Sequence, residues 1–123
     1  MYTKDLLGKT LTAISPCKKG DDSITFFTAD GFMWKFQHDQ DCCECVLVED
    51  ICGDMSDLID SPLLQAEETS SCDPEPYGGS DSFTWTFYKF ATIKGSVTIR
   101  WLGESNGYYS EKVDLKVTPL LTV

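Results

Sequence analysis

Alternating apolar and polar residues dominate the sequence and predict β-strands. The expected strands span residues 11–15, 24–26, 32–36, 45–51, 62–68, 82–93, 97–101 and 113–117. One segment differs, because Asp54 can cap a short helix at about 54–60. The pattern therefore predicts a mostly β fold, either an antiparallel sheet or a partly open β-barrel or sandwich, with one short helix. The chain length fits one domain, residues 1–123.

The first clear hairpin joins the runs 24–26 and 32–36 through an Ala-Asp-Gly segment. A two-residue turn would place Phe26 opposite a lysine, which spoils the apolar face. A three-residue loop places Phe26 opposite Trp34 instead. We therefore predict the three-residue loop, with Ile24 opposite Phe36 and a positive φ at Gly31.

The same reasoning predicts a second hairpin near the C-terminus, joined through Ser-Asn-Gly. A two-residue Asn-Gly turn would place a lysine opposite a core tryptophan. A three-residue loop pairs Ile99 with Val113 and Val97 with Leu115, and it requires a positive φ at Gly107.

Residues 82–93 form the longest β-prone run and are expected to be the central strand. Its aromatic residues change parity near Phe87 and Tyr88, which indicates either a bulge there or a strand covered on both faces. The segment 69–81, rich in Pro, Gly and Ser, is expected to be an exposed loop.

Charge is distributed unevenly along the chain. The formal net charge is −10, yet residues 36–88 contain 13 Asp or Glu residues and no Lys or Arg. We expect a strongly negative surface from His38 to Asp81, which favours a basic protein partner and disfavours direct contact with nucleic acid or an anionic membrane. The candidate binding residues are His38, Asp39, Asp41, Glu44, Glu49, Asp50, Asp54 and Asp57. The alternative interpretation is a solvated face that maintains solubility.

The densest group of unusual side chains lies at 38–45, which holds the only histidine and three of the six cysteines. Zinc could be bound by His38, Cys42 and Cys45 together with a fourth, more distant cysteine. No second close pair of ligands follows, so buried apolar cysteines are the favoured interpretation. We expect no bound metal and at least one buried thiol, with Cys43 and Cys45 on one face and Cys42 on the other.

Enzymatic chemistry has the least support. Neighbouring carboxylates would raise the pKa of a cysteine thiol near His38, which disfavours nucleophilic catalysis. The carboxylates from Glu49 to Asp60 do not have the spacing of a calcium-binding EF-hand loop. No phosphate-cradling glycine loop is present, and hydrophobic residues at 41% suffice for a core without a structural metal. We expect no enzyme, no catalytic residue and no cofactor.

The N-terminal residues lack the basic start and apolar run of a secretory signal, and no segment has the apolar length of a membrane span. We expect a cytoplasmic protein that does not enter a membrane. In that compartment the cysteines are expected to be mostly reduced.

Two segments are distinctive: His-Asp-Gln-Asp-Cys-Cys-Glu at 38–44 and Ser-Phe-Thr-Trp-Thr-Phe-Tyr-Lys-Phe-Ala-Thr-Ile-Lys-Gly at 82–95. Together with the stretches at 2–9, 48–54 and 99–111, they resemble a family of small bacteriophage and prophage proteins of unassigned function. The resemblance covers most of the chain and implies a short phage product that acts in a bacterial cytoplasm.

Small acidic phage proteins of this kind resemble inhibitors that occupy a host protein, including a defence protein, and others resemble sponges for a signalling nucleotide. The acidic middle favours the first kind, because a nucleotide sponge normally presents Lys or Arg to phosphate. We therefore expect a non-enzymatic binding protein that contacts a basic host protein. The alternative is a small-ligand or metal-binding module centred on His38 and Cys42 to Cys45.

Overall fold

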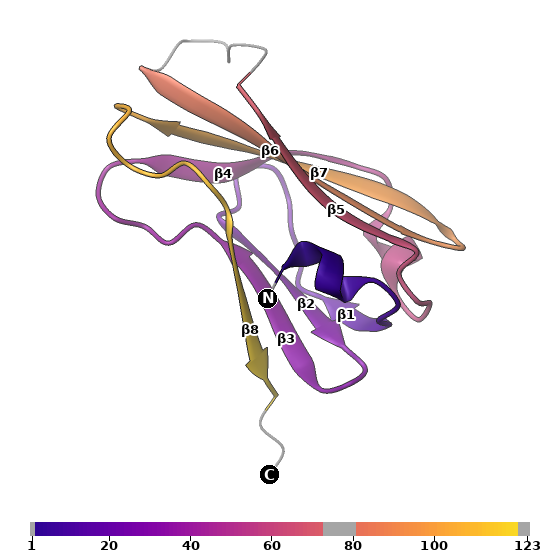
Figure 1. Cartoon of the computed structure of the whole chain (residues 1–123). Helices are drawn as coiled ribbons and strands as arrows, with labels where there is room; N and C mark the ends of the chain where they lie inside the picture. Colours follow the sequence, from indigo (N-terminus) through magenta and orange to yellow (C-terminus); the bar gives the residue numbers. More distant parts are fainter. Residues whose placement is uncertain (1, 73–80, 121–123) are drawn as a thin grey trace.

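The computed structural model describes residues 2–72 and 81–120 of the 123-residue chain (Figure 1). Its elements in order are η1 (Thr3–Leu6), β1 (Leu11–Ile14), β2 (Ser23–Thr28), β3 (Phe32–Gln37), β4 (Cys45–Cys52), η2 (Met55–Leu58), β5 (Gln65–Ser71), β6 (Ser82–Thr92), β7 (Gly95–Ser105) and β8 (Asp114–Pro119). Within the described residues, no helix has the length and apolar character needed to cross a membrane.

Two four-stranded antiparallel sheets pack face to face, with strand orders β1-β2-β3-β8 and β4-β7-β6-β5 (Figure 1). The fold is thus an all-β sandwich, which confirms the mostly β prediction and selects the sandwich among its options. The short helix near 54–60 is also confirmed, as the single 3-10 turn η2. Asp54 caps this turn, because its Oδ1 accepts from the backbone N–H of Ser56 at 3.0 Å.

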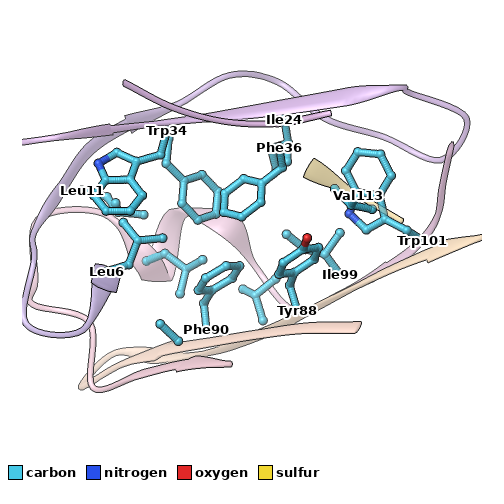
Figure 2. Close-up of a cluster of buried hydrophobic side chains, with 14 of the residues drawn as sticks. Leu6, Leu11, Ile24, Trp34, Phe36, Tyr88, Phe90, Ile99, Trp101 and Val113 are labelled. Carbon is cyan, nitrogen blue, oxygen red and sulfur yellow. The ribbon is translucent and has the colours of Figure 1, made fainter. Parts of the chain in front are cut away.

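Aromatic side chains from both sheets form the centre of the core (Figure 2). Phe26 and Phe36 of one sheet meet Tyr88 and Phe90 of the other. The ring centroids of Phe36 and Tyr88 lie 4.9 Å apart, and those of Phe26 and Phe90 lie 5.0 Å apart, both edge-to-face. Such pairs add about 1 kcal/mol each beyond the burial of their area. The alternating aromatic positions of β3 and β6 therefore hold the two sheets together.

The first hairpin has the predicted register. Phe26 pairs with Trp34 and Ile24 with Phe36, and Gly31 has a φ of 91°. The side chain of Thr28 accepts from Trp34 Nε1 at 3.2 Å. The apolar parity of β2 and β3 therefore determined the loop length, as only this register places Ile24 and Phe26 opposite Phe36 and Trp34 on the inner face.

The second predicted hairpin is wrong, although Gly107 does have a positive φ of 92°. β7 pairs with β4 and β6, and β8 crosses to the other sheet, where Leu115 lies opposite Phe36. Val97 and Leu115 therefore belong to different sheets. The physical reason is that both edges of β7 are already paired, with β4 and β6. β8 pairs instead with β3, where its apolar side chains also face the core.

β6 is an interior strand between β5 and β7, as predicted for the central strand. Its pairing with both neighbours continues without a register shift, so there is no bulge at Phe87 and Tyr88. Instead the outward-facing Trp85 is only 5% exposed, and the guanidinium of Arg100 lies 4.6 Å from its ring centre. The strand is thus covered at Trp85 on its outer face as well as along its inner face.

The loop expected at 69–81 begins later than predicted. β5 extends to Ser71 and pairs with β6 along its whole length, with Ser71 opposite Trp85. Residues 73–80 of the expected loop lie outside the described residues.

Candidate functional site at one end of the sandwich

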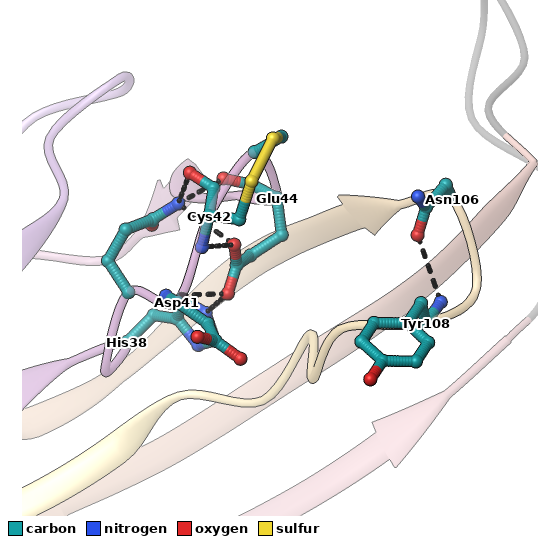
Figure 3. The surroundings of a disulfide bond; sticks show 8 residues. His38, Asp41, Cys42, Glu44, Asn106 and Tyr108 are labelled. Carbon is teal, nitrogen blue, oxygen red and sulfur yellow. Dashed lines mark hydrogen bonds and ion pairs between the residues drawn. A yellow bond between two sulfur atoms is a disulfide. The ribbon is translucent and has the colours of Figure 1, made fainter.

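Two connections between the sheets lie at the same end of the sandwich. Loop 38–44 joins β3 to β4, and loop 106–113 joins β7 to β8. The strand ends that they connect are paired, because Gln37 lies opposite Asp114 and Cys45 lies opposite Glu104. The two loops together form what we call the loop end of the molecule (Figure 3).

His38 begins the first loop and points inward, with 7% of the residue exposed. Its Nδ1 lies 2.7 Å from the carbonyl oxygen of Lys112, and its Nε2 lies 2.8 Å from Glu44 Oε2. Burial lowers the pKa of His38, but the hydrogen bonds to Glu44 and Lys112 and the charges of Glu44 and Asp114 outweigh it and raise the pKa. Because both ring nitrogens face acceptors, the geometry fits the imidazolium form, which donates from both.

Glu44 has a fully buried side chain at the centre of the same loop. Besides His38, the backbone N–H of Asp41 donates to its Oε2 at 3.0 Å, and that of Cys42 donates to its Oε1 at 2.7 Å. Burial alone would raise the pKa of Glu44, but these donors lower it to about 2. The loop is therefore wrapped around an ionised carboxylate of its own (Figure 3).

Gln40 closes the loop from the other side. Its Nε2 lies 2.7 Å from the backbone oxygen of Glu44, and 3.1 Å from both the oxygen of Cys42 and Glu44 Oε1. These contacts fix the backbone of a segment that has no regular secondary structure, so its exposed side chains are held in defined positions.

The cysteines differ from the prediction. Cys42 and Cys43 form a disulfide, and both are exposed, as is Cys45. The expectation of at least one buried thiol among the three is therefore wrong. The physical reason is that Glu44, which meets four donor groups, occupies the inward position, while Val46 is the first inward residue of β4. The other four cysteines of the chain are free, in line with the expectation of mostly reduced cysteines, to which this disulfide is an exception.

No zinc arrangement forms around His38. Both of its ring nitrogens are used by oxygen acceptors, which leaves none for a metal. The described residues contain no group of three or more His, Cys, Asp or Glu side chains placed to hold a metal ion. The cysteine Cys17, far from this cluster in sequence, is half-buried, and burial together with the charge of Asp21 raises its thiol pKa to about 11.

The structure separates the predicted binding residues into groups. His38, Asp39, Asp41 and Glu44 come together at the loop end. Glu49 and Asp50 lie on β4, with Glu49 3.6 Å from Lys19 Nζ and Asp50 3.3 Å from Arg100 Nη2. Asp54 and Asp57 lie at η2, at the opposite end of β4.

The acidic middle of the chain does not form one negative face among its described residues, 36–72 and 81–88. Its two long strands, β4 and β5, are the opposite edges of one sheet. The described acidic residues of the expected negative surface from His38 to Asp81 are thus divided between these two edges, the loop end and η2. Charged side chains on edge strands oppose pairing with another chain, which is a sufficient structural role for many of these residues.

Loop 106–113 contains residues that the sequence did not single out. Buried Glu111 accepts hydrogen bonds from Thr84 Oγ1 and Ser105 Oγ, and these hydroxyl donors outweigh its burial and lower its pKa. The loop crosses directly over Gly103, where a Cβ atom would lie 2.3 Å from the backbone oxygen of Glu111. A side chain at position 103 would collide with the crossing loop, so glycine is required there, and sequence parity does not reveal that crossing.

Tyr108 is a large exposed aromatic residue that this loop presents. It is 83% exposed, and its backbone N–H donates to Asn106 Oδ1 at 3.0 Å. Its ring contacts that of Tyr109 edge-to-face at 5.0 Å. Figure 3 shows Tyr108 on the loop that neighbours the Cys42–Cys43 segment. The sequence did contain a signal for this residue: Tyr108 and Tyr109 directly follow the turn dipeptide Asn-Gly, where side chains are usually exposed.

Comparison with known proteins gives a family but no relative of established function. Neither the search of curated proteins nor the search of solved structures found a match. A family model described as a domain of unknown function (DUF7448) matches residues 4–115, and the chain therefore belongs to this family.

Proposed function

We propose that this chain is a non-enzymatic binding protein whose loop end contacts a basic surface of another protein. The observation that carries the proposal is that two neighbouring loops, each built around a buried carboxylate, hold exposed side chains in fixed positions. Loops positioned by a rigid β-sandwich are the usual place for binding residues in such folds.

The exposed side chains of the loop end suit a basic partner. Asp39 and Asp41 are exposed, and their carboxylates make no ion pair within residues 2–72 and 81–120. Tyr108 adds a large exposed aromatic surface on the second loop of the loop end. Carboxylates and a tyrosine together can bind Arg and Lys side chains through charge and through the face of the ring.

The family resemblance supplies the proposed setting. A phage or prophage origin places the protein in the bacterial cytoplasm, with a host protein as the partner and inhibition of a host defence protein as the biological role. The net charge of −10 supports a protein partner over nucleic acid or an anionic membrane.

A pull-down from bacterial lysate tests the proposal. The test variant combines Asp39→Asn, Asp41→Asn and Tyr108→Ala at the loop end. A matched control combines Asp60→Asn, Glu67→Gln and Tyr2→Ala, which change charge and exposed aromatic area equally at distant positions. Asn is readily accommodated at the positive φ of Asp60.

We expect the wild type and the control to retain the same partner at low salt and to release it as salt screens the charges. The loop-end variant should lose that partner at every salt concentration. Equal capture by the loop-end variant, or loss of the partner only in the control, would overturn the assignment of the binding surface. Absence of any partner for the wild type would overturn the proposed function itself.

A further inference from the structure

Lys35 and Lys116 lie directly opposite each other on β3 and β8. Their chain neighbours Trp34 and Phe36 face the core, so Lys35 points to the outer face of the sheet, and the paired Lys116 does the same. Like charges directly opposite each other on antiparallel strands destabilise the pair. The repulsion between the two ammonium groups therefore needs to be offset by a group of opposite charge.

The described part of the protein provides no carboxylate that pairs with either ammonium group. Neither ammonium group makes a hydrogen bond or an ion pair with any residue among 2–72 and 81–120. The nearest carboxylate along β8, that of Asp114, is already engaged: it accepts from the backbone N–H of Asp39 at 2.8 Å and lies 3.5 Å from Lys112 Nζ. In a chain with 20 acidic and 10 basic residues, two facing cations without an acidic partner are a distinctive local feature.

The two lysines line a surface hollow of about 370 Å³. Gln37, His38, Asp39 and Asp114 complete its lining. The Gln37 side chain makes no hydrogen bond with the described residues and is free to donate, and the His38 ring lies at the inner wall. The hollow is thus lined by two cationic groups, the Gln37 amide and two carboxylates, with Asp114 opposite Gln37 and Lys116 opposite Lys35 across the strand pair.

We propose that this hollow binds the phosphate group of a small phosphate monoester between the ammonium groups of Lys35 and Lys116. Lysine is a suitable point charge for phosphate, and the Gln37 amide can donate to a further phosphate oxygen. The carboxylate of Asp39 can accept from a hydroxyl or amino group on the rest of the molecule. The same carboxylates repel additional phosphates, so the site favours a single small ligand over a nucleic acid strand.

This inference goes beyond the proposed protein-binding function: it shares His38 and Asp39 with the loop end, but its phosphate-binding groups, Lys35 and Lys116, lie on the outer face of β3 and β8. Two charge-neutralising variants, Lys35→Gln and Lys116→Gln, test it. The matched control is Lys89→Gln, an exposed lysine on β6 of the other sheet. The probes are inorganic phosphate and a nucleoside 5′-monophosphate, titrated at low ionic strength and followed by amide chemical shifts and by calorimetry.

We expect saturable binding by the wild type and by Lys89→Gln, with the largest shifts on β3 and β8. Each hollow variant should bind about tenfold more weakly, as expected for the loss of one charged hydrogen bond. Phosphate should raise the Tm of the wild type and the control more than that of either hollow variant. Without phosphate, removing one of the facing charges should raise Tm.

Three results would overturn the inference. The first is an absence of saturation by either probe up to about 10 mM, since weaker binding than this is not specific. The second is an equal loss of binding in Lys89→Gln, which would show a nonspecific charge effect. The third is tighter binding of a single-stranded oligonucleotide than of the monophosphate, which would assign the face to nucleic acid.

Discussion

His38 Nε2 and Glu44 Oε2 lie 2.8 Å apart inside the loop that connects the two sheets. His38 is the only histidine of the chain, and the pair joins the start of the loop to its end. The remaining ring nitrogen binds the carbonyl oxygen of Lys112 on the second loop. The His38 ring therefore connects both loops of the loop end, and its protonation makes their arrangement depend on pH.

The first prediction concerns that pH dependence. The pKa of His38 is raised above its ordinary 6.5, so its contribution to stability is complete below that pH and is lost as the pH rises through the folded-state pKa. The pKa of Glu44 is lowered from 4.5 to about 2, so its contribution is lost only as the pH falls below 4.5. Unfolding by urea at a series of pH values should show the free energy of unfolding falling above about pH 6.5.

A His38→Gln variant provides the control for this prediction. It should be less stable than the wild type near pH 6, and it should lack the decline that histidine deprotonation causes at higher pH. An identical pH profile for the two proteins would contradict the role of His38.

The second prediction compares two carboxylates of the same loop. Glu44→Gln removes the charge that faces the buried His38 and replaces one acceptor oxygen by an NH₂ donor, so it should lower Tm by several degrees. Asp41→Asn changes an exposed side chain and should leave Tm nearly unchanged. Thermal unfolding followed by circular dichroism measures both, and an equal effect of the two substitutions would contradict the buried position of Glu44.

Much of the fold follows from parity in the sequence. The first hairpin could be predicted because only one register places Phe26, Trp34 and Phe36 on the same inner face. The second could not, because alternation shows which face of a strand is buried but not which strand lies beside it. Leu115 fits equally well beside Val97 or beside Phe36, and it lies beside Phe36 because both edges of β7 are paired with β4 and β6.

The unusual residues of the loop end could be located from the sequence, but the prediction of which of them are buried and which are exposed was wrong. Residues 38–45 were recognised as unusual, and apolar cysteines were assigned to the inside. The structure buries Glu44 instead, because backbone N–H groups of an irregular loop converge on its carboxylate. The order of side-chain types along the sequence does not show where such backbone donors lie. The Lys35 and Lys116 pair was missed for a related reason, since the β3–β8 register joins distant segments.

The third prediction concerns the Cys42–Cys43 disulfide. Linking two adjacent residues closes a very short loop and restricts the unfolded chain little, so the bond should contribute only about 1 kcal/mol to stability. The hydrogen bonds to Glu44 hold the loop independently of the sulfur atoms. Thermal unfolding with and without a phosphine reductant should give similar Tm values, with thiol titration as proof of reduction. Loss of the folded state on reduction would contradict this account.

The last prediction tests which aromatic side chains hold the sheets together. Phe36 is 1% exposed and contacts the rings of Phe26 and Tyr88, so Phe36→Ala should lower the free energy of unfolding by about 3–5 kcal/mol. Phe87 is the matched control, because it lies on β6 but faces outward and is only partly buried, and Phe87→Ala should cost about 1 kcal/mol. Urea titrations of the two variants measure both values. Equal losses would mean that the outer face of β6 packs as tightly as the core, because the cost of truncation depends on the cavity that remains.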